Sequence, residues 1–181
     1  MEQAKTSLNK KRRMEIARKF VSGAAYNMQK NLNYYSRKGK DVSDNIERIT
    51  CYTKEIEFTK DTDELMGLEG SIRKIYYNGF DKILSNFVME GRSKQPPLNE
   101  VNALISFGNM MCYSQCIRAI YQTQLNPTIS FLHSPGYRRF SLALDIAEIF
   151  KPILVDRVIF KVLNKGMIKS SDFDKNLNKV L

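Results

Sequence analysis

Apolar side chains recur at intervals of three and four residues along most of this 181-residue chain, which is the spacing of one face of an α-helix. The first such stretch runs from about residue 9 to residue 37 and has its apolar positions at Met14, Ala17, Ala24, Met28, Leu32 and Tyr35. Strand-like alternation never extends beyond a few residues, and the sequence contains no internal repeat. We therefore expect an all-α fold.

The further helices are expected between capping and breaking residues. Ser43 can cap a second helix that ends near Phe58, and Thr62 can cap a third helix. Their hydroxyls can accept hydrogen bonds from the free amides of the first turn of each helix. The other predicted elements are, in order, a breaker-rich loop over residues 91–97, a helix over 99–121, a loop over 130–138, a helix that starts near Ser141 and is kinked or restarted at Pro152, and a short helix over 170–181.

Positive charge is concentrated at the amino-terminal end. Residues 1–40 hold 11 Lys and Arg against 2 Glu, a net charge of +9, whereas residues 41–181 hold 18 against 17, a net charge of +1. We interpret residues 1–40 as a basic linker and first helix, and residues 41–181 as a helical domain that is compact together with that helix. The basic end favours nucleic acid as a partner, although a solvated helix with a frayed basic tip has the same composition.

The composition argues against several other classes. The sequence has no run of about 20 apolar residues that would predict a membrane span, and its charged amino terminus lacks the apolar stretch of a secretory signal. The three cysteines favour neither a disulfide framework nor zinc, because a single histidine accompanies them. We interpret Cys112 and Cys116 as small buried thiols and expect a reducing cytoplasm.

Three acidic residues occupy positions where apolar side chains are expected. Residues 140–150 (FSLALDIAEIF) form a helix that is apolar nearly all round, and Asp145 and Glu148 share one side of it. Glu69 lies within the apolar stripe of the third helix. Buried carboxylates need a cation, a proton or a basic partner, and Arg73, four residues from Glu69, is one candidate partner.

His133, the only histidine, lies between an apolar stretch and a turn sequence. One imidazole with two or three carboxylates suits Mg²⁺ or Mn²⁺ and leaves positions for water and phosphate. A polar stripe along the predicted 99–121 helix consists of Asn102, Ser106, Asn109 and Tyr113. This stripe is either the solvent-facing side of the helix or the lining of a polar cleft.

Three separated stretches together resemble the CRISPR-associated adaptation integrase, the first-numbered protein of those systems. They are GLEGSIRKIYY at 67–77, PPLNEVNALISFGN at 96–109 and FLHSPGYRRFSLALDIAEIFKPILVDR at 131–157. The resemblance covers about residues 40–170 and implies the helical catalytic domain of that family. It implies a metal bound by Glu69, His133 and Glu148, with Asp145 assisting at the site.

The resemblance also assigns the family's active-site tyrosine to Tyr113 and places Asn102 at a further polar position of the same helix. From charge and proximity we add Arg73, Arg138 and Arg139 as phosphate contacts. The family inserts short DNA fragments into CRISPR arrays by transesterification in antiviral defence. It acts on double-stranded and branched DNA together with a small ferredoxin-like partner, the second-numbered protein of these systems.

The family normally begins with a β-rich domain that forms most of a homodimer interface, and nothing strand-rich precedes residue 40 here. We therefore expect this chain to be a truncated form or an expressed catalytic domain, and expect the homodimer of the longer family proteins only. The alternative function is a non-enzymatic basic helical module that binds DNA or a protein scaffold. Such a module has no need to bury three acids around one histidine.

Overall fold

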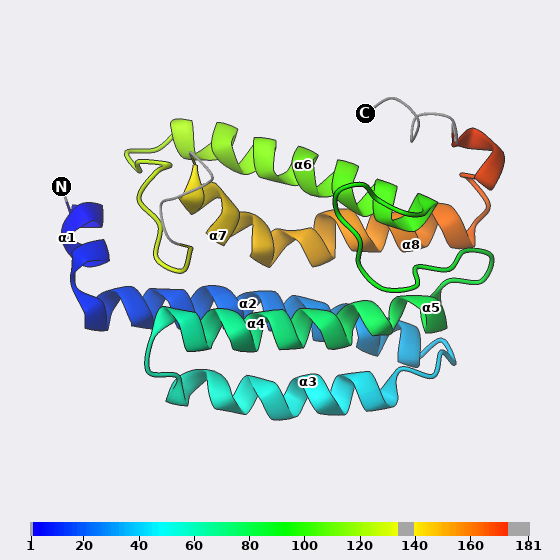
Figure 1. Cartoon of the computed structure of the whole chain (residues 1–181), viewed down its shortest axis with the longest axis horizontal. Coiled ribbons are helices and arrows are strands. Elements are labelled where there is room, and N and C mark those ends of the chain that lie inside the picture. The colour runs from blue at the N-terminus through cyan, green and yellow to red at the C-terminus, as the bar shows by residue number, and fades with distance from the viewer. Residues whose placement is uncertain (1, 134–139, 174–181) are drawn as a thin grey trace.

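The computed structural model describes residues 2–133 and 140–173, and every regular element within these ranges is helical (Figure 1). The all-α expectation is therefore confirmed. The elements are α1 (Glu2–Leu8), α2 (Lys10–Ser36), α3 (Ser43–Glu55) with a 3₁₀ turn at Ile56–Phe58, α4 (Thr62–Asn78), α5 (Phe80–Ile83), α6 (Glu100–Tyr121), α7 (Ser141–Lys151), a π-helical turn (Pro152–Asp156), α8 (Arg157–Asn164) and a 3₁₀ turn (Ser170–Asp172). In the described residues no helix is both long and apolar enough to cross a membrane.

The predicted helix boundaries were close, but the two predicted caps were wrong. Ser43 is the first residue of α3 rather than its cap, and Val42 before it makes no capping side-chain bond. Asp61, not Thr62, caps α4 by accepting hydrogen bonds from the amides of Asp63 and Glu64. Asp61 and Thr62 are both suitable capping residues, and the extended backbone at Asp61 makes it the cap. Most of the predicted 170–181 helix lies outside the described residues.

Helix α2 lies at the centre of the molecule and packs against α3, α4 and α7, while α6 covers α7 and α8 (Figure 1). Helix α6 closely approaches the π-helical turn at Gly108, where an added Cβ would lie 2.5 Å from the side chain of Val155. An aromatic cluster joins the helices at one end. Phe80 contacts Tyr76 and Phe160 with ring centroids 5.2 and 4.5 Å apart, which fixes the carboxyl end of α4 against α8.

The predicted kink at Pro152 is a π-helical turn between α7 and α8. The amide of Asn31 on α2, which is buried, donates to the Pro152 carbonyl at 2.5 Å and to the Tyr76 hydroxyl at 3.0 Å. This single side chain therefore ties α2, α4 and the turn together. The two helices that hold the acidic residues, α4 and α7, are thereby both fixed to α2.

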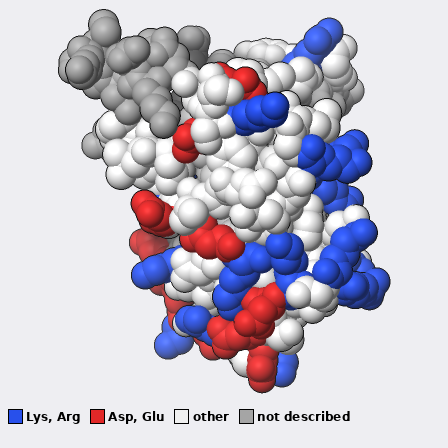
Figure 2. All heavy atoms as spheres, turned by 90° about the vertical axis from the view of Figure 1, so that its right-hand side faces the viewer, with Lys and Arg blue, Asp and Glu red and all other residues white. Residues whose placement is uncertain are grey.

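Charge is unevenly distributed on the surface. At the end of the molecule shown in Figure 2, Lys and Arg gather along one edge, acidic and basic residues mix below, and the area above them has only a few charged residues. Two arginines of the amino-terminal segment serve the fold itself. Arg18 donates to the Thr59 carbonyl at 2.5 Å, and Arg13 donates to the Phe131 carbonyl at 2.7 Å. The basic segment is therefore partly structural.

Candidate active site

Glu69 and Glu148 meet at one guanidinium although 79 residues separate them in the sequence. Glu69 is on the apolar side of α4, next to the fully buried Leu65 and Ile72, and its side chain is 20% exposed. Glu148 on α7 is 15% exposed. Arg73 contacts Oε1 of Glu69 through Nη2 and through Nε, the latter at 2.7 Å, and the same Nη2 lies 2.5 Å from Oε2 of Glu148.

The geometry of this cluster leaves one oxygen without a hydrogen bond. Among the described residues, Oε2 of Glu148 is buried and accepts no hydrogen bond, because its contact with Arg73 is an ion pair without hydrogen-bond geometry. Oε1 of Glu148 accepts from Nζ of Lys151 at 2.5 Å. Burial raises the pKa of Glu148, but Arg73 and Lys151 outweigh burial and lower that pKa to about 2. Glu148 is therefore ionised at neutral pH.

Asp145 holds His133 and the segment before it in place. Its carboxylate is fully buried and accepts backbone N–H bonds from Phe131, Leu132 and His133 at 2.8, 3.0 and 3.1 Å. Its Oδ1 also lies 2.7 Å from Nδ1 of His133. An imidazole that donates from Nδ1 keeps Nε2 as its acceptor, which is how carboxylates orient metal-binding histidines. His133 also helps to lower the pKa of Glu148 and so lies within its electrostatic range.

Helix α1 holds residues 126–130, which precede His133, by side-chain hydrogen bonds that the sequence did not suggest. Gln3 on α1 donates to the carbonyls of Asn126 and Ile129 at 3.0 and 2.8 Å, and the Ser7 hydroxyl donates to the Ser130 carbonyl at 3.0 Å. Together with Arg13, these side chains fix the backbone up to His133. Residues 134–139, which include Arg138 and Arg139, lie outside the described residues.

The polar stripe of α6 faces the protein at Asn102, which is fully buried. Its amide donates to the Met89 and Gly91 carbonyls, and its Oδ1 accepts from Arg92 at 2.9 Å. Asn102 therefore positions the loop that carries Arg92. The other predicted residue on this stripe, Tyr113, donates to the Phe140 carbonyl at 3.4 Å.

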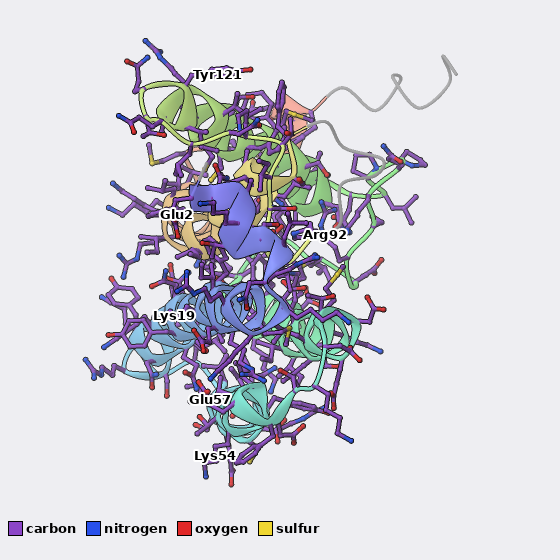
Figure 3. All side chains as sticks on the ribbon, turned by 90° about the vertical axis from the view of Figure 1, so that its left-hand side faces the viewer. Glu2, Lys19, Lys54, Glu57, Arg92 and Tyr121 are labelled. Atoms are coloured by element: carbon purple, nitrogen blue, oxygen red, sulfur yellow. The ribbon has the colours of Figure 1, made fainter. Side chains whose placement is uncertain are left out.

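Arg92 is a candidate functional residue that the sequence reading missed, since residues 91–97 were interpreted only as a loop. Its guanidinium donates to Oδ1 of Asn102 and to the Ser106 hydroxyl, each at 2.9 Å. Within the described ranges no carboxylate pairs with it. In Figure 3 it lies on the side of the view opposite Lys19 of α2. A guanidinium held by neutral acceptors keeps its charge available for an anion.

In the part of the chain that the structure describes, no three His, Cys, Asp or Glu side chains lie close enough together to hold a metal ion. Glu69 and Glu148 are brought together, with Arg73 located between the two carboxylates, and His133 affects Glu148 through its charge. The three cysteines are free, and Cys112 and Cys116 are buried as predicted.

Asp156, in the π-helical turn, is a buried acid that the sequence reading did not single out. Burial raises its pKa to about 7 from an ordinary value of 3.8, although a hydrogen bond with Tyr76 and the charges of Arg73 and Lys151 oppose the rise and Glu148 adds to it. Its Oδ1 is buried and has no hydrogen bond among the described residues. The sequence feature that could have indicated Asp156 is the position of an acidic residue within the apolar run that follows Pro152.

Asp156→Asn is expected to stabilise the protein at pH 8 and not at pH 4. The folded-state pKa lies above the unfolded value, so ionisation of Asp156 costs stability as the pH rises from about 4 through 7. Removing that cost is worth on the order of 2–4 kcal/mol at pH 8. Urea unfolding of wild type and Asp156→Asn at pH 4 and pH 8 measures the difference in their free energies of unfolding. An equal difference at pH 4 and pH 8 would contradict the assignment.

The comparisons with known proteins agree on one family. The family model described as "CRISPR associated protein Cas1" matches residues 1–181. "CRISPR-associated endonuclease Cas1 2" of Thermodesulfovibrio yellowstonii is 47% identical over 183 residues, which cover 100% of this chain and 56% of that protein. The chain thus spans little more than half the length of this relative.

Two solved structures share the fold. The structure of a CAS1 protein from Thermotoga maritima has a TM-score of 0.86 and 41% identity over 96% of this chain and 54% of its own. A casposase bound to integration product has a TM-score of 0.85 and 26% identity over 95% of this chain and 48% of its own.

Proposed function

Since the chain belongs to the Cas1 family, we propose that it is the helical catalytic half of a DNA endonuclease and integrase that inserts short DNA fragments into CRISPR arrays in antiviral defence. One observation supports this most strongly. Two acids from helices far apart in sequence, Glu69 and Glu148, share a nearly buried cluster, and a buried carboxylate orients the imidazole of His133, whose charge acts on Glu148. The similarity to a casposase bound to integration product favours strand insertion over cleavage alone.

The types of donor present suit a bound Mg²⁺ or Mn²⁺, although in the described residues three of them come close enough to share an ion only if side chains move. Among the described residues Oε2 of Glu148 is buried and accepts no hydrogen bond, and Asp145 orients His133 so that Nε2 can coordinate. Two carboxylates and one imidazole suit these cations and leave coordination positions for phosphate and water. We propose Glu69, Glu148 and His133 as the ligands. When bound, the cation polarises the scissile phosphate and stabilises the charge on the departing oxygen.

The reaction that we propose is transesterification at phosphorus. The 3′-hydroxyl oxygen of the incoming fragment forms a bond to the phosphorus of the target strand, and the bond to the target's 3′-oxygen breaks. The hydroxyl proton is lost to solvent, and the departing 3′-oxygen gains one, so bonds and protons balance. Water in place of the 3′-hydroxyl gives endonuclease cleavage by the same route. Much of the rate comes from holding both strands in line.

Basic and polar side chains of the chain supply this positioning. Arg92, held by Asn102 and Ser106 without a carboxylate partner in the described ranges, can donate to a phosphate oxygen. Tyr113 can donate to the phosphate or guide the nucleophile, because its hydroxyl bond to the Phe140 carbonyl is long, at 3.4 Å. Arg138 and Arg139 remain proposed phosphate contacts.

The proposed partners are double-stranded and branched DNA and the small ferredoxin-like second-numbered protein of CRISPR systems. A homodimer is proposed for the longer family proteins. These assignments rest on family membership and on the net charge of +10.

The proposed activity is tested by incubating the chain with branched DNA and a labelled fragment in Mn²⁺. A fragment with a 3′-hydroxyl is expected to become joined to the target, whereas a fragment with a 3′-deoxy end is not, and a chelator abolishes both joining and nicking. Binding of DNA without metal-dependent joining or nicking would instead support the non-enzymatic module.

A further inference from the structure

Arg73 is the one cation in the described residues that contacts both acids of the proposed metal centre. Its Nη2 touches Oε1 of Glu69 and lies 2.5 Å from Oε2 of Glu148, and its side chain is 17% exposed. Lys151, by comparison, contacts only Glu148, three residues before it on the same helix. Arg73 therefore lies between the two carboxylates, where a shared divalent cation would have to contact them both.

The charges of this cluster are already balanced. Glu69 and Glu148 contribute −2, and Arg73 and Lys151 contribute +2. A divalent cation placed on the same carboxylates would give this nearly buried group a net charge of +2, which is unfavourable at low effective dielectric. Either the cation does not bind or one of the resident cations leaves.

We propose that Arg73 is the resident counter-ion of the metal-free state and must release Glu69 and Glu148 before a divalent cation binds. This inference rests on the proposed metal centre. Arg73 is the group that must move because its guanidinium lies between the carboxylates, whereas Lys151 touches only one of them from the side. The released guanidinium stays beside the site and is free to donate to a DNA phosphate.

A consequence is that metal and DNA bind cooperatively. A phosphate that accepts the released guanidinium compensates for the ion pairs that the metal breaks. Bound metal likewise favours DNA binding, because coupling between two ligands is reciprocal. The arginine thereby disfavours a loaded metal centre in the absence of DNA.

The test measures Mn²⁺ binding to the 181-residue chain without DNA by titration calorimetry, for wild type, Arg73→Gln and Arg48→Gln. Arg48 is the matched control, because it pairs with Asp44 at the same i,i+4 spacing, but on the surface. Arg73→Gln is expected to bind Mn²⁺ at least about tenfold more tightly than wild type, and Arg48→Gln to bind like wild type. The metal-free Arg73→Gln protein is also expected to melt several degrees lower, and Mn²⁺ is expected to raise its melting temperature more than that of wild type.

Equal or weaker Mn²⁺ binding by Arg73→Gln, alongside measurable binding by wild type, would overturn the proposal. Arg73→Lys keeps the positive charge but lacks the guanidinium fork that spans two carboxylates. Its affinity for Mn²⁺ is therefore expected to lie between those of wild type and Arg73→Gln. This second variant keeps the test valid if Arg73→Gln fails to fold. If no variant binds Mn²⁺ in the presence of DNA, the metal centre itself is wrong. If binding by wild type is lost in Glu148→Gln but unaffected by Arg73→Gln, only the role of Arg73 is wrong.

Discussion

Glu148→Gln is expected to lower Mn²⁺-dependent nicking and strand transfer by at least about 100-fold while the protein stays folded. The amide has the shape of the carboxylate but no charge, so it is a poor ligand for a hard cation. Losing a metal ligand removes several kcal/mol of transition-state stabilisation, which corresponds to this loss in rate. The measurement is the rate of nicking and joining on branched DNA at saturating Mn²⁺, with circular dichroism to confirm the helical fold.

Glu47→Gln is the matched control, since Glu47 is an exposed glutamate on α3. It is expected to keep the wild-type rate within about threefold, because a single exposed charge is largely screened. A Glu148→Gln protein that nicks and joins DNA at the rate of this control would show that the activity comes from another site.

Asp145→Asn is expected to destabilise the protein by about 3 kcal/mol and to reduce activity by at least tenfold. Both carboxylate oxygens accept N–H bonds in a fully buried position, so an amide nitrogen in either place would face donors and leave some of them unpaired. The same change removes the carboxylate that orients His133. Urea unfolding measures the first effect, and the nicking rate measures the second.

The single histidine gives this prediction an independent readout. Nitrogen NMR of the imidazole reports which ring nitrogen holds the proton, and Asp145→Asn is expected to shift the population away from the Nδ1-protonated form. Asp44→Asn, a change at a surface ion pair, is the control and is expected to alter neither stability nor the imidazole signals. An Asp145→Asn protein as stable as this control, with unchanged imidazole signals, would contradict the role assigned to Asp145.

The fold could be predicted largely from the sequence because its helices are amphipathic. Helix α4 shows how: Leu65, Ile72 and Tyr76 recur at helical spacing and are all buried. The caps were harder, because Asp61 and Thr62 are both suitable and only the backbone geometry decides between them. The short helix α5 was not predicted, since a four-residue helix has no periodicity of its own.

The buried or nearly buried positions of Glu69, Asp145 and Glu148 could be predicted, because these acids occupy apolar stretches of the sequence. The way in which Arg73 is shared was not predictable. Its pairing with Glu69 follows from i,i+4 spacing, but its contact with Glu148 depends on how α4 packs against α7. The same holds for Arg92, whose position depends on a loop that folds back onto Asn102.

The most direct test of the proposed metal centre is a crystal structure of the chain with Mn²⁺ and a DNA strand end. Anomalous scattering would locate the Mn²⁺ ion in this structure. We predict one ion about 2.0–2.3 Å from carboxylate oxygens of Glu69 and Glu148 and from Nε2 of His133, with Arg73 moved away from both acids. An ion bound elsewhere, or Glu69 and Glu148 still paired with Arg73 at saturating Mn²⁺, would contradict it.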